Sequence, residues 1–533
     1  MKKIVALLIS FVLLFSGCGT APEKTEINNE NDSVFIELSD SAITVNGSDI
    51  TSDSTQPVYS SNDIVFYLAG QDFTYGEGKK EDEHEQIEAD AHTVVHITKP
   101  GRYVLSGTLS LGQIAIDLGE DSETDPNAVV TLILNNVDIN CKVAPAIIFY
   151  NVYECCSSDE ETATKDVDTR NAGANVIIAD DSENNINGSY VAKIYKSYEL
   201  SEDGNEVVDS KKLHKYDGAF YSKKTMNISG GDKGNGILNI NAENEGLDSE
   251  LHLTINGGII NITSGNDGIN TNEDNVSVTT INGGTLNIIC NGSSGEGDGI
   301  DSNGWLVING GTVTAQACSS SGDAGIDSDK GIHINGGKVI ASGNMLDRIA
   351  DSNQTYVVFG FAGFQQGGNT YTLKNSADKV VYEYTPENDF TYLLIAGDEL
   401  TPDDYTFWQE NIQLSGSKTQ NMQGGMIPVE KPQMPSGEQG APHEIPEGME
   451  IPEKPNGNIP QDGRSEILNG DMQQDVRPGM PGGEKPEIPD DMIPPDNEGG
   501  IMGGNMIPGK ELSTIFTLTE GENQFFDVAY AAE

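Results

Sequence analysis

The tetrapeptide Ile-Asn/Ser-Gly-Gly recurs five times between residues 226 and 350, and this repeat constrains the fold more than any other feature of the chain. Successive copies begin 27, 26, 27 and 26 residues apart, at Ile228, Ile255, Ile281, Ile308 and Ile334. A fixed period of this length is typical of solenoids, in which each coil is too small to bury a core alone and stacks on its neighbours. The repeat therefore predicts one solenoid rather than several globular domains.

The residues between the repeats predict β-strands. Short runs of mainly β-branched residues follow the Gly-Gly pairs, at 259–262, 285–288, 312–315 and 338–341. They are bounded by Gly, Asn and Ser and lack helical spacing of apolar residues. Leucine-rich repeats share the period, but their leucine-dominated consensus is absent. The Asn-Gly-Gly segments supply residues that tolerate positive φ where a coil turns. We therefore predict an all-β parallel β-helix with coils about 4.8 Å apart.

A second motif, acid-Gly-Leu/Ile-Asp/Asn, accompanies the first at 245–248, 267–270 and 298–301, and weakly at 323–327. Equivalent positions on stacked coils would form a ladder of acids. Two bare carboxylates about 5 Å apart repel by roughly 3 kcal/mol at an effective dielectric near 20. Calcium prefers oxygen ligands in irregular geometry. We therefore predict a calcium ladder, with a solvated Asp- and Gly-rich turn as the alternative. Its candidate ligands are Glu245, Asp248, Asp267, Asn270, Asp298, Asp301, Asp323 and Asp327.

The N-terminus predicts export and membrane attachment. Two lysines precede an apolar run over residues 4–15, as in a signal peptide, and the run is short for a membrane span. Ser16-Gly-Cys18 resembles the cleavage box of bacterial lipoproteins, although Phe15 stands where leucine is usual. The resemblance implies a lipoprotein signal peptide over 1–18 and a lipid anchor on Cys18 at the cell surface. An ordinary cleaved signal is the alternative.

The rest of the chain divides by composition. Residues 19–33 are predicted to form a flexible tether, and 34–416 the parallel β-helix with a β cap at its C-terminal end. Polar segments at 77–90, 155–172 and 190–215 are predicted to be surface loops. Residues 417–511 hold 15 of the 22 prolines and nine of the 12 methionines, which predicts a disordered insertion. Strands within 512–533 are expected to complete the domain.

Net charge and cysteine content limit the partners. The formal charge of −54 argues against nucleic acid, because no basic face is available to meet phosphates. An anionic polymer could bind only through a bridging metal or a local basic spot. Five cysteines follow Cys18, an odd number whose spacing matches no zinc motif, and we assign no disulfide. Of these, Cys290 and Cys318 are expected to be buried in adjacent coils.

Several ordered motifs resemble a known family. Residues 298–304, followed by 307–311 and 324–327, resemble a bacterial cell-surface carbohydrate-binding family, as does 217–223 leading into 226–230. The resemblance covers about 33–410 and the last twenty residues. It implies a right-handed parallel β-helix with bound calcium, related in fold to pectate lyases, and binding of cellulose or acidic, pectin-like polysaccharide. Asn270 in place of an acid, Ala324 and Ala350 depart from the pattern, so the last coil is not expected to hold an ion.

Two functions follow, and binding is favoured over catalysis. The first is a monomeric polysaccharide-binding lipoprotein, in which Trp305 is the aromatic candidate for sugar contact, with a packed turn as the alternative. The second is a calcium-dependent polysaccharide lyase, which needs a base beside the cation. Arg348 is a weak catalytic candidate, since pairing with Asp347 or Asp351 is favoured. A structural adhesin also remains open. Further basic candidates are Lys330, Lys338, His252 and His333.

Overall fold

The structure, a computed structural model, describes residues 33–419 and 512–531 and is nearly all β. The predicted all-β class is confirmed. The predicted signal peptide, Cys18, the tether up to residue 32 and the predicted insertion over 420–511 lie outside the described residues. Within the described ranges, no helix is long and apolar enough to cross a membrane.

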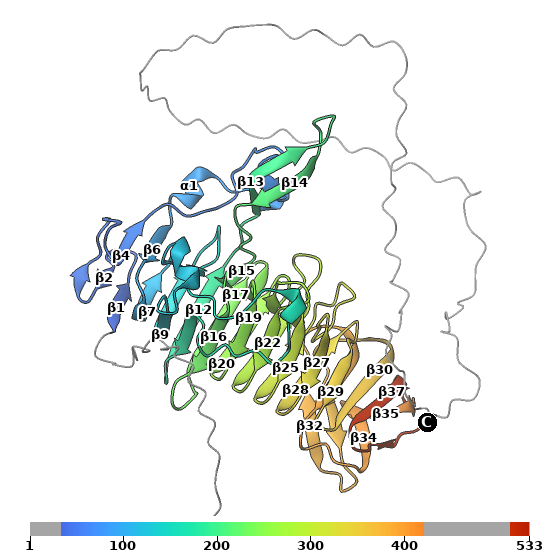
Figure 1. Ribbon diagram of the computed structural model, residues 1–533. Helices are drawn as coiled ribbons and strands as arrows, with labels where there is room; N and C mark the ends of the chain where they lie inside the picture. Colours follow the sequence, from blue (N-terminus) through green and yellow to red (C-terminus); the bar gives the residue numbers. More distant parts are fainter. Residues whose placement is uncertain (1–32, 420–511, 532–533) are drawn as a thin grey trace, which may run out of the picture. The chain divides into compact units, whose positions relative to one another are not determined.

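Three stacks of strands make up most of the fold, and the strands follow one another along each stack in chain order (Figure 1). The first stack is parallel throughout and contains β1 (Val34–Leu38), β7 (Gly101–Leu109), β9 (Val130–Asn140), β11 (Ala174–Ile178), β16 (Met226–Gly230), β19 (His252–Ile255), β22 (Val278–Ile281), β25 (Trp305–Ile308), β27 (Gly331–Ile334) and β29 (Ile349–Ser352).

The second stack begins from the same long β9 and is also parallel. It continues with β12 (Glu183–Gly188), β17 (Ile237–Ala242), β20 (Ile259–Ser264), β23 (Thr285–Cys290), β26 (Thr312–Gln316) and β28 (Lys338–Gly343). Each copy of the repeat therefore supplies one strand before the Gly-Gly pair and one strand after it.

The third stack carries the acid motifs. It is parallel apart from its first strand and contains β4 (Val58–Ser61), β6 (Thr93–Ile97), β8 (Gly112–Asp117), β10 (Ile147–Asn151), β15 (Gly218–Ser222), β18 (Glu245–Ser249), β21 (Ile269–Thr271) and β24 (Ile300–Ser302). Buried apolar side chains from all three stacks, such as Ile228, Ile262 and Leu247, belong to one core.

The repeat isoleucines are in register across five consecutive strands. Ile228 is the Cα partner of Ile255, followed by Ile281, Ile308 and Ile334, and all five side chains are buried. The second glycine in four of the motifs has a φ between 86° and 98°, as expected for a turn that favours glycine. At Gly284 a Cβ would also lie 2.7 Å from the Gly258 carbonyl oxygen of the neighbouring coil. The motif therefore sets both the turn and the register.

A second core of packed aromatic side chains lies in the C-terminal cap. The cap begins where β33 (Phe390–Ala396) pairs antiparallel with β28. Its strands are β30 (Tyr356–Gln365), β31 (Tyr371–Lys374), β32 (Val380–Tyr384), β33 (Phe390–Ala396), β34 (Asp404–Gln409), β35 (Ile412–Lys418), β36 (Phe516–Thr517) and β37 (Glu522–Tyr530). Phe359 and Phe407 stack with ring centres 4.1 Å apart in the cap core. Strand β37 pairs with β30 and β35, so residues after the 420–511 segment join the cap.

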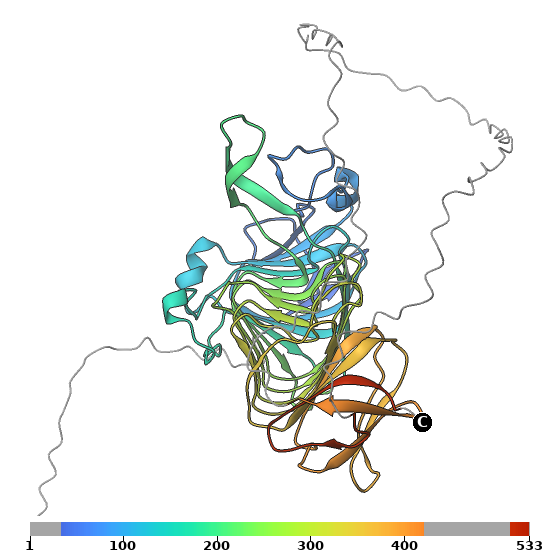
Figure 2. The same ribbon diagram turned by 90° about the vertical axis from the view of Figure 1, so that its right-hand side faces the viewer.

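Two segments predicted to be surface loops are largely exposed but contain regular secondary structure. Residues 190–215 form an antiparallel hairpin of β13 (Lys193–Leu200) and β14 (Val207–Lys212), which stands away from the stacked strands in both views (Figures 1 and 2). Gly204 turns the hairpin with a φ of 72°, a signal that its polar composition obscured. Residues 77–90 contain helix α1 (Gln86–Ala89). The remaining short elements are β2 (Thr44–Val45), β3 (Ser48–Asp49), β5 (Gly76–Glu77) and 3₁₀ turns at Lys80–Asp82, Glu120–Thr124 and Glu160–Thr162.

Candidate functional site

The asparagines of the repeat form a hydrogen-bonded ladder along the first turn, which sequence reasoning missed. Four side chains donate from Nδ2 to Oδ1 of the preceding asparagine in the set, over distances of 2.8 to 3.3 Å; the donors are Asn282, Asn309, Asn335 and Asn353. We call this set the asparagine ladder; its members are Asn256, Asn282, Asn309, Asn335 and Asn353. The recurrence of Asn before Gly-Gly was the signal that could have found it. An amide can donate and accept, so this ladder satisfies itself.

The last positions of the acid motifs also stack, on the third stack of strands. Asp248 is the Cα partner of Asn270, and Asn270 is the partner of Asp301. Asp327 follows on the next coil, where its N–H donates to the Ile300 carbonyl oxygen at 2.7 Å. The structure therefore brings together the four predicted residues of this position, as the period required.

The first positions of the motifs link adjacent coils through the backbone. Asp267 Oδ1 accepts a hydrogen bond from the Asp298 N–H at 2.7 Å, and Asp298 Oδ1 accepts one from the Ala324 N–H at 2.5 Å. Asp323 lies one residue before that register position and accepts from the Gly297 N–H at 2.6 Å. One oxygen of each of these three carboxylates thus has a structural partner.

Three buried oxygens on the two neighbouring strands β18 and β21 have no hydrogen-bond partner, and they define the candidate site. They are Oε2 of Glu245, Oδ2 of Asp248 and Oδ1 of Asn270, and each residue is less than 7% exposed. The side chains lie against one another, because Asn270 Nδ2 donates to Glu245 Oε1 at 2.9 Å. Asn272 Nδ2 likewise donates to Asp248 Oδ1 at 2.5 Å. We call Glu245, Asp248 and Asn270 the oxygen cluster.

Lys215 is a residue of the site that sequence reasoning missed. It follows the β13–β14 hairpin, and its Nζ donates to Asn272 Oδ1 at 3.0 Å beside the oxygen cluster. Burial lowers the pKa of Lys215, whereas the charges of Asp217, Asp248 and Glu245 raise it. Together the acids outweigh burial, so the pKa of Lys215 lies above its usual value. The hairpin therefore delivers a protonated amine to the acids. No periodic signal marks this lysine, because it belongs to an insertion rather than to a repeat.

The pKa values of the acids are raised, and burial is the largest cause in each case. Burial and the charge of Asp217 raise the pKa of Glu245 to about 7. Burial and Asp329 raise the pKa of Asp301 to about 6, and burial and Asp347 raise that of Asp327 to about 7. Burial followed by neighbouring acids also raises the pKa values of Asp248, Asp267 and Asp298. Ionising these groups is unfavourable without further positive charge.

The donor set of the oxygen cluster fits a hard cation. It offers carboxylate and amide oxygens that lack partners, and such oxygens are the ligands calcium prefers. A search of residues 33–419 and 512–531 for three or more His, Cys, Asp or Glu side chains with ligand atoms within 4.8 Å of one another gives one group. Its members are Glu154, Cys155 and Cys156. We call the stacked residues Glu245, Asp248, Asn270, Asp301 and Asp327 the acid ladder. Its carboxylate oxygens lie farther apart than the ligand atoms of that group, because Asn270 and Asn272 lie between its carboxylates.

The remaining candidates lie elsewhere on the coils. Trp305 opens β25 and is partly exposed, with Lys330 Nζ 5.9 Å from its ring centre. Arg348 is exposed, and in the described part of the chain it forms no ion pair with Asp347 or Asp351. The buried His252 accepts a hydrogen bond at Nδ1 from the Val278 N–H at 3.0 Å. Cys290 and Cys318 are buried, as predicted, whereas His333 and Lys338 are partly buried.

Comparisons with known proteins give one family and one solved structure. The family described as "Carbohydrate-binding domain-containing protein" matches residues 91–381. A solved structure of a polysaccharide lyase-like protein from C. thermocellum, a gadolinium derivative, is 19% identical and has a TM-score of 0.32. The match covers 60% of this chain and 93% of that chain. No curated protein matches the sequence.

Proposed function

Because the chain belongs to the family of carbohydrate-binding domain-containing proteins, we propose that it is an exported surface lipoprotein that binds polysaccharide, either cellulose or acidic, pectin-like glycans. The family match covers more than half of the 533 residues. In this proposal the three strand stacks are the faces of a right-handed parallel β-helix stiffened by calcium. The molecule acts as a monomer and is held at the membrane by lipid on Cys18.

The observation that carries the calcium part of the proposal is the set of three buried oxygens without partners. Glu245, Asp248 and Asn270 would hold one ion, and Asp301 and Asp327 continue the same ladder on the next coils. Calcium supplies the positive charge that neighbouring buried carboxylates require, and its spare coordination positions can accept carboxylates of an acidic glycan. A buried polar atom left unpaired costs about 1–3 kcal/mol, so three on adjacent strands favour a bound cation.

A polysaccharide lyase is the second candidate, and Lys215 is the observation that bears on it. Lyase chemistry needs a base beside the cation that stabilises the enolate. Lys215 lies beside the acids, but they raise its pKa and hold it protonated. In that state it can pair with a glycan carboxylate and cannot accept a proton. Arg348, the candidate from the sequence, is exposed. Binding is therefore the function that this geometry favours.

The test is binding of the full chain to insoluble cellulose and to immobilised polygalacturonate, with calcium and with a chelator. We expect retention on at least one of these polysaccharides, and weaker retention on polygalacturonate when calcium is removed. If neither polysaccharide retains the chain and a glycan array is also blank, polysaccharide binding is refuted. Formation of unsaturated products from polygalacturonate would instead favour the lyase.

The two tryptophans of the chain give a matched pair for locating the sugar contact. Both Trp305 and Trp408 are partly exposed and lie near a lysine, at 5.9 Å from Lys330 and 5.1 Å from Lys374. Trp305→Ala is expected to weaken polysaccharide binding about tenfold, the size of effect typical of an aromatic contact residue. Trp408→Ala in the cap should leave binding unchanged. Equal binding by both variants would remove Trp305 from the site.

A further inference from the structure

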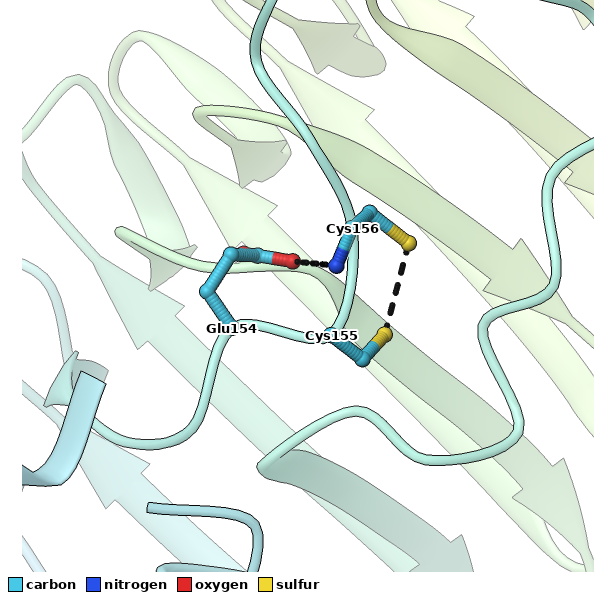
Figure 3. Close-up of side chains that lie close together, drawn as sticks. All are labelled: Glu154, Cys155 and Cys156. Carbon is cyan, nitrogen blue, oxygen red and sulfur yellow. Dashed lines mark hydrogen bonds between the residues drawn. The ribbon is translucent and has the colours of Figure 1, made fainter. Parts of the chain in front are cut away.

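Two adjacent cysteines occupy a fixed position outside the acid ladder. Cys155 and Cys156 lie in the segment after β10, and their Sγ atoms are 3.3 Å apart (Figure 3). Both side chains are partly exposed. The three other described cysteines, Cys141, Cys290 and Cys318, are at most 1% exposed. The pair is therefore the accessible thiol site among the described residues.

Glu154 fixes the backbone of this pair. As Figure 3 shows, its Oε1 accepts the Cys156 N–H, at 2.9 Å. Oε1 also accepts the Thr225 hydroxyl, and Oε2 accepts the Thr225 N–H, each at 2.8 Å. Farther along the segment, the Thr169 hydroxyl lies 2.8 Å from that of Thr254 on β19. The segment is thus attached to the strands at both ends, and the sulfur atoms are held in place.

His252 is close enough to Cys156 to influence its pKa. Its Nδ1 accepts the Val278 N–H at 3.0 Å, so the ring proton of the neutral imidazole must be on Nε2. The imidazole is one of the groups that lower the pKa of the Cys156 thiol. Hydrogen bonds from Cys155 and then His252 lower the pKa of Cys156 to about 5, despite burial and the charge of Glu154. The contact with Cys156, followed by burial, raises the pKa of the Cys155 thiol.

We propose that Cys155 and Cys156 form a redox-active vicinal dithiol whose oxidising substrate is a low-molecular-weight disulfide. The Cys156 thiolate attacks one sulfur of that disulfide, forming a mixed disulfide and releasing the other half as a thiolate. Cys155 then loses its proton and attacks the Cys156 sulfur, which closes the Cys155–Cys156 bond and releases the second thiolate. The protein gives up two electrons and two protons, and the substrate becomes two thiols.

The hydrogen bonds favour this chemistry over metal binding. Two thiols and a carboxylate within 4.8 Å could attract a thiophilic ion. However, the Glu154 oxygens already accept three hydrogen bonds, and His252 presents an N–H rather than a lone pair. Two accessible sulfur atoms 3.3 Å apart, one of them with a lowered pKa, match the arrangement that thiol–disulfide exchange requires.

The test treats the reduced, folded full chain with oxidised glutathione, followed by acid quenching and peptide mapping of each cysteine. We expect the peptide with both residues to lose two hydrogens and to retain no glutathione. Cys141, Cys290 and Cys318 are internal controls and should stay reduced. Cys155→Ser should stop at the mixed disulfide and retain one glutathione on Cys156. Cys156→Ser should react at least tenfold more slowly.

A variant at His252 tests the positioning role without removing either thiol. His252→Asn keeps an acceptor for the Val278 N–H, but its shorter side chain removes the imidazole that lowers the pKa of Cys156. Its first step should slow about tenfold at pH 7, because less thiolate is present. Circular dichroism confirms that the variant is folded. An unreactive wild-type pair would overturn the proposal. Zinc added alone would also overturn it if it bound one-to-one and required both cysteines.

Discussion

The asparagine ladder and the acid ladder follow the same repeat, yet they differ in how their polar atoms are satisfied. Asn282 and Asn309 each donate to the preceding coil and accept from the next, at 2.8 to 2.9 Å. In the acid ladder, Glu245 and Asp248 each keep one buried oxygen without a partner. Carboxylates only accept, so stacking them produces an unmet need for protons or cations. The same repeat thus gives self-paired side chains at the turn and buried oxygens without partners on the third stack of strands.

Removing calcium is expected to have the largest effect that separates the ladders. An ion that binds only the folded chain stabilises it by about 4 kcal/mol when free calcium is a thousandfold above Kd. A chelator at pH 8 should therefore lower the unfolding temperature, which differential scanning fluorimetry measures. The asparagine ladder contributes nothing to this change. Superimposable melting curves with calcium and with chelator would refute the calcium ladder.

The pH dependence in the presence of a chelator is the next largest effect. The folded pKa values of Glu245, Asp301 and Asp327 are about 7, 6 and 7, above the values of the unfolded chain. The folded chain therefore binds these protons more tightly. The associated stability is fully present below about pH 4, the unfolded pKa, and is lost as pH rises through about 6 to 7. For Glu245 alone the change is at most roughly 3 kcal/mol.

Calcium should oppose this trend, because the ion binds the ionised carboxylates and competes with protons. Denaturant unfolding at pH 5 and pH 8, with and without calcium, gives the comparison. Stability that rises from pH 5 to pH 8 in the chelator would contradict the raised pKa values. A similar pH response with and without calcium would contradict the competition.

The sequence predicted what the period controls. The isoleucine register and the stacking of Asp248, Asn270 and Asp301 follow from spacing, because a constant period brings the same repeat position into register on successive paired strands. Contacts between an inserted segment and the repeated strands have no periodic signal in the sequence, so they could not be predicted from it. Lys215 reaches the acids from the end of a hairpin, and His252 meets Cys156 across almost a hundred residues of sequence. Side-chain chemistry at such contacts requires the fold.

Asp248→Asn makes one rung of the acid ladder resemble the asparagine ladder. At pH 8 in the chelator it should raise the free energy of unfolding by about 1–2 kcal/mol. Asparagine has no proton to lose, so it avoids the cost of either ionising the buried carboxyl beside Glu245 and Asp217 or keeping it protonated. With calcium it should lower stability, because a charged ligand is lost. Asp138→Asn on the exposed surface of β9 is the matched control and should change neither. Destabilisation by Asp248→Asn in both conditions would show that the carboxylate acts without an ion.

Asn309→Asp is the reverse exchange and should have the smallest effect. The new carboxylate keeps the acceptor for Asn335 Nδ2, but it loses the donor to Asn282 Oδ1 and places two oxygens in contact. Because Asn309 is exposed, the loss should be about 1 kcal/mol and the same with calcium and with chelator. Asn309→Ala, which loses both bonds without repulsion, is the control for lost hydrogen bonding. A calcium response in Asn309→Asp alone would show that stacking makes an ion site of any carboxylate. Burial, which distinguishes Glu245 and Asp248, would then not be the deciding factor.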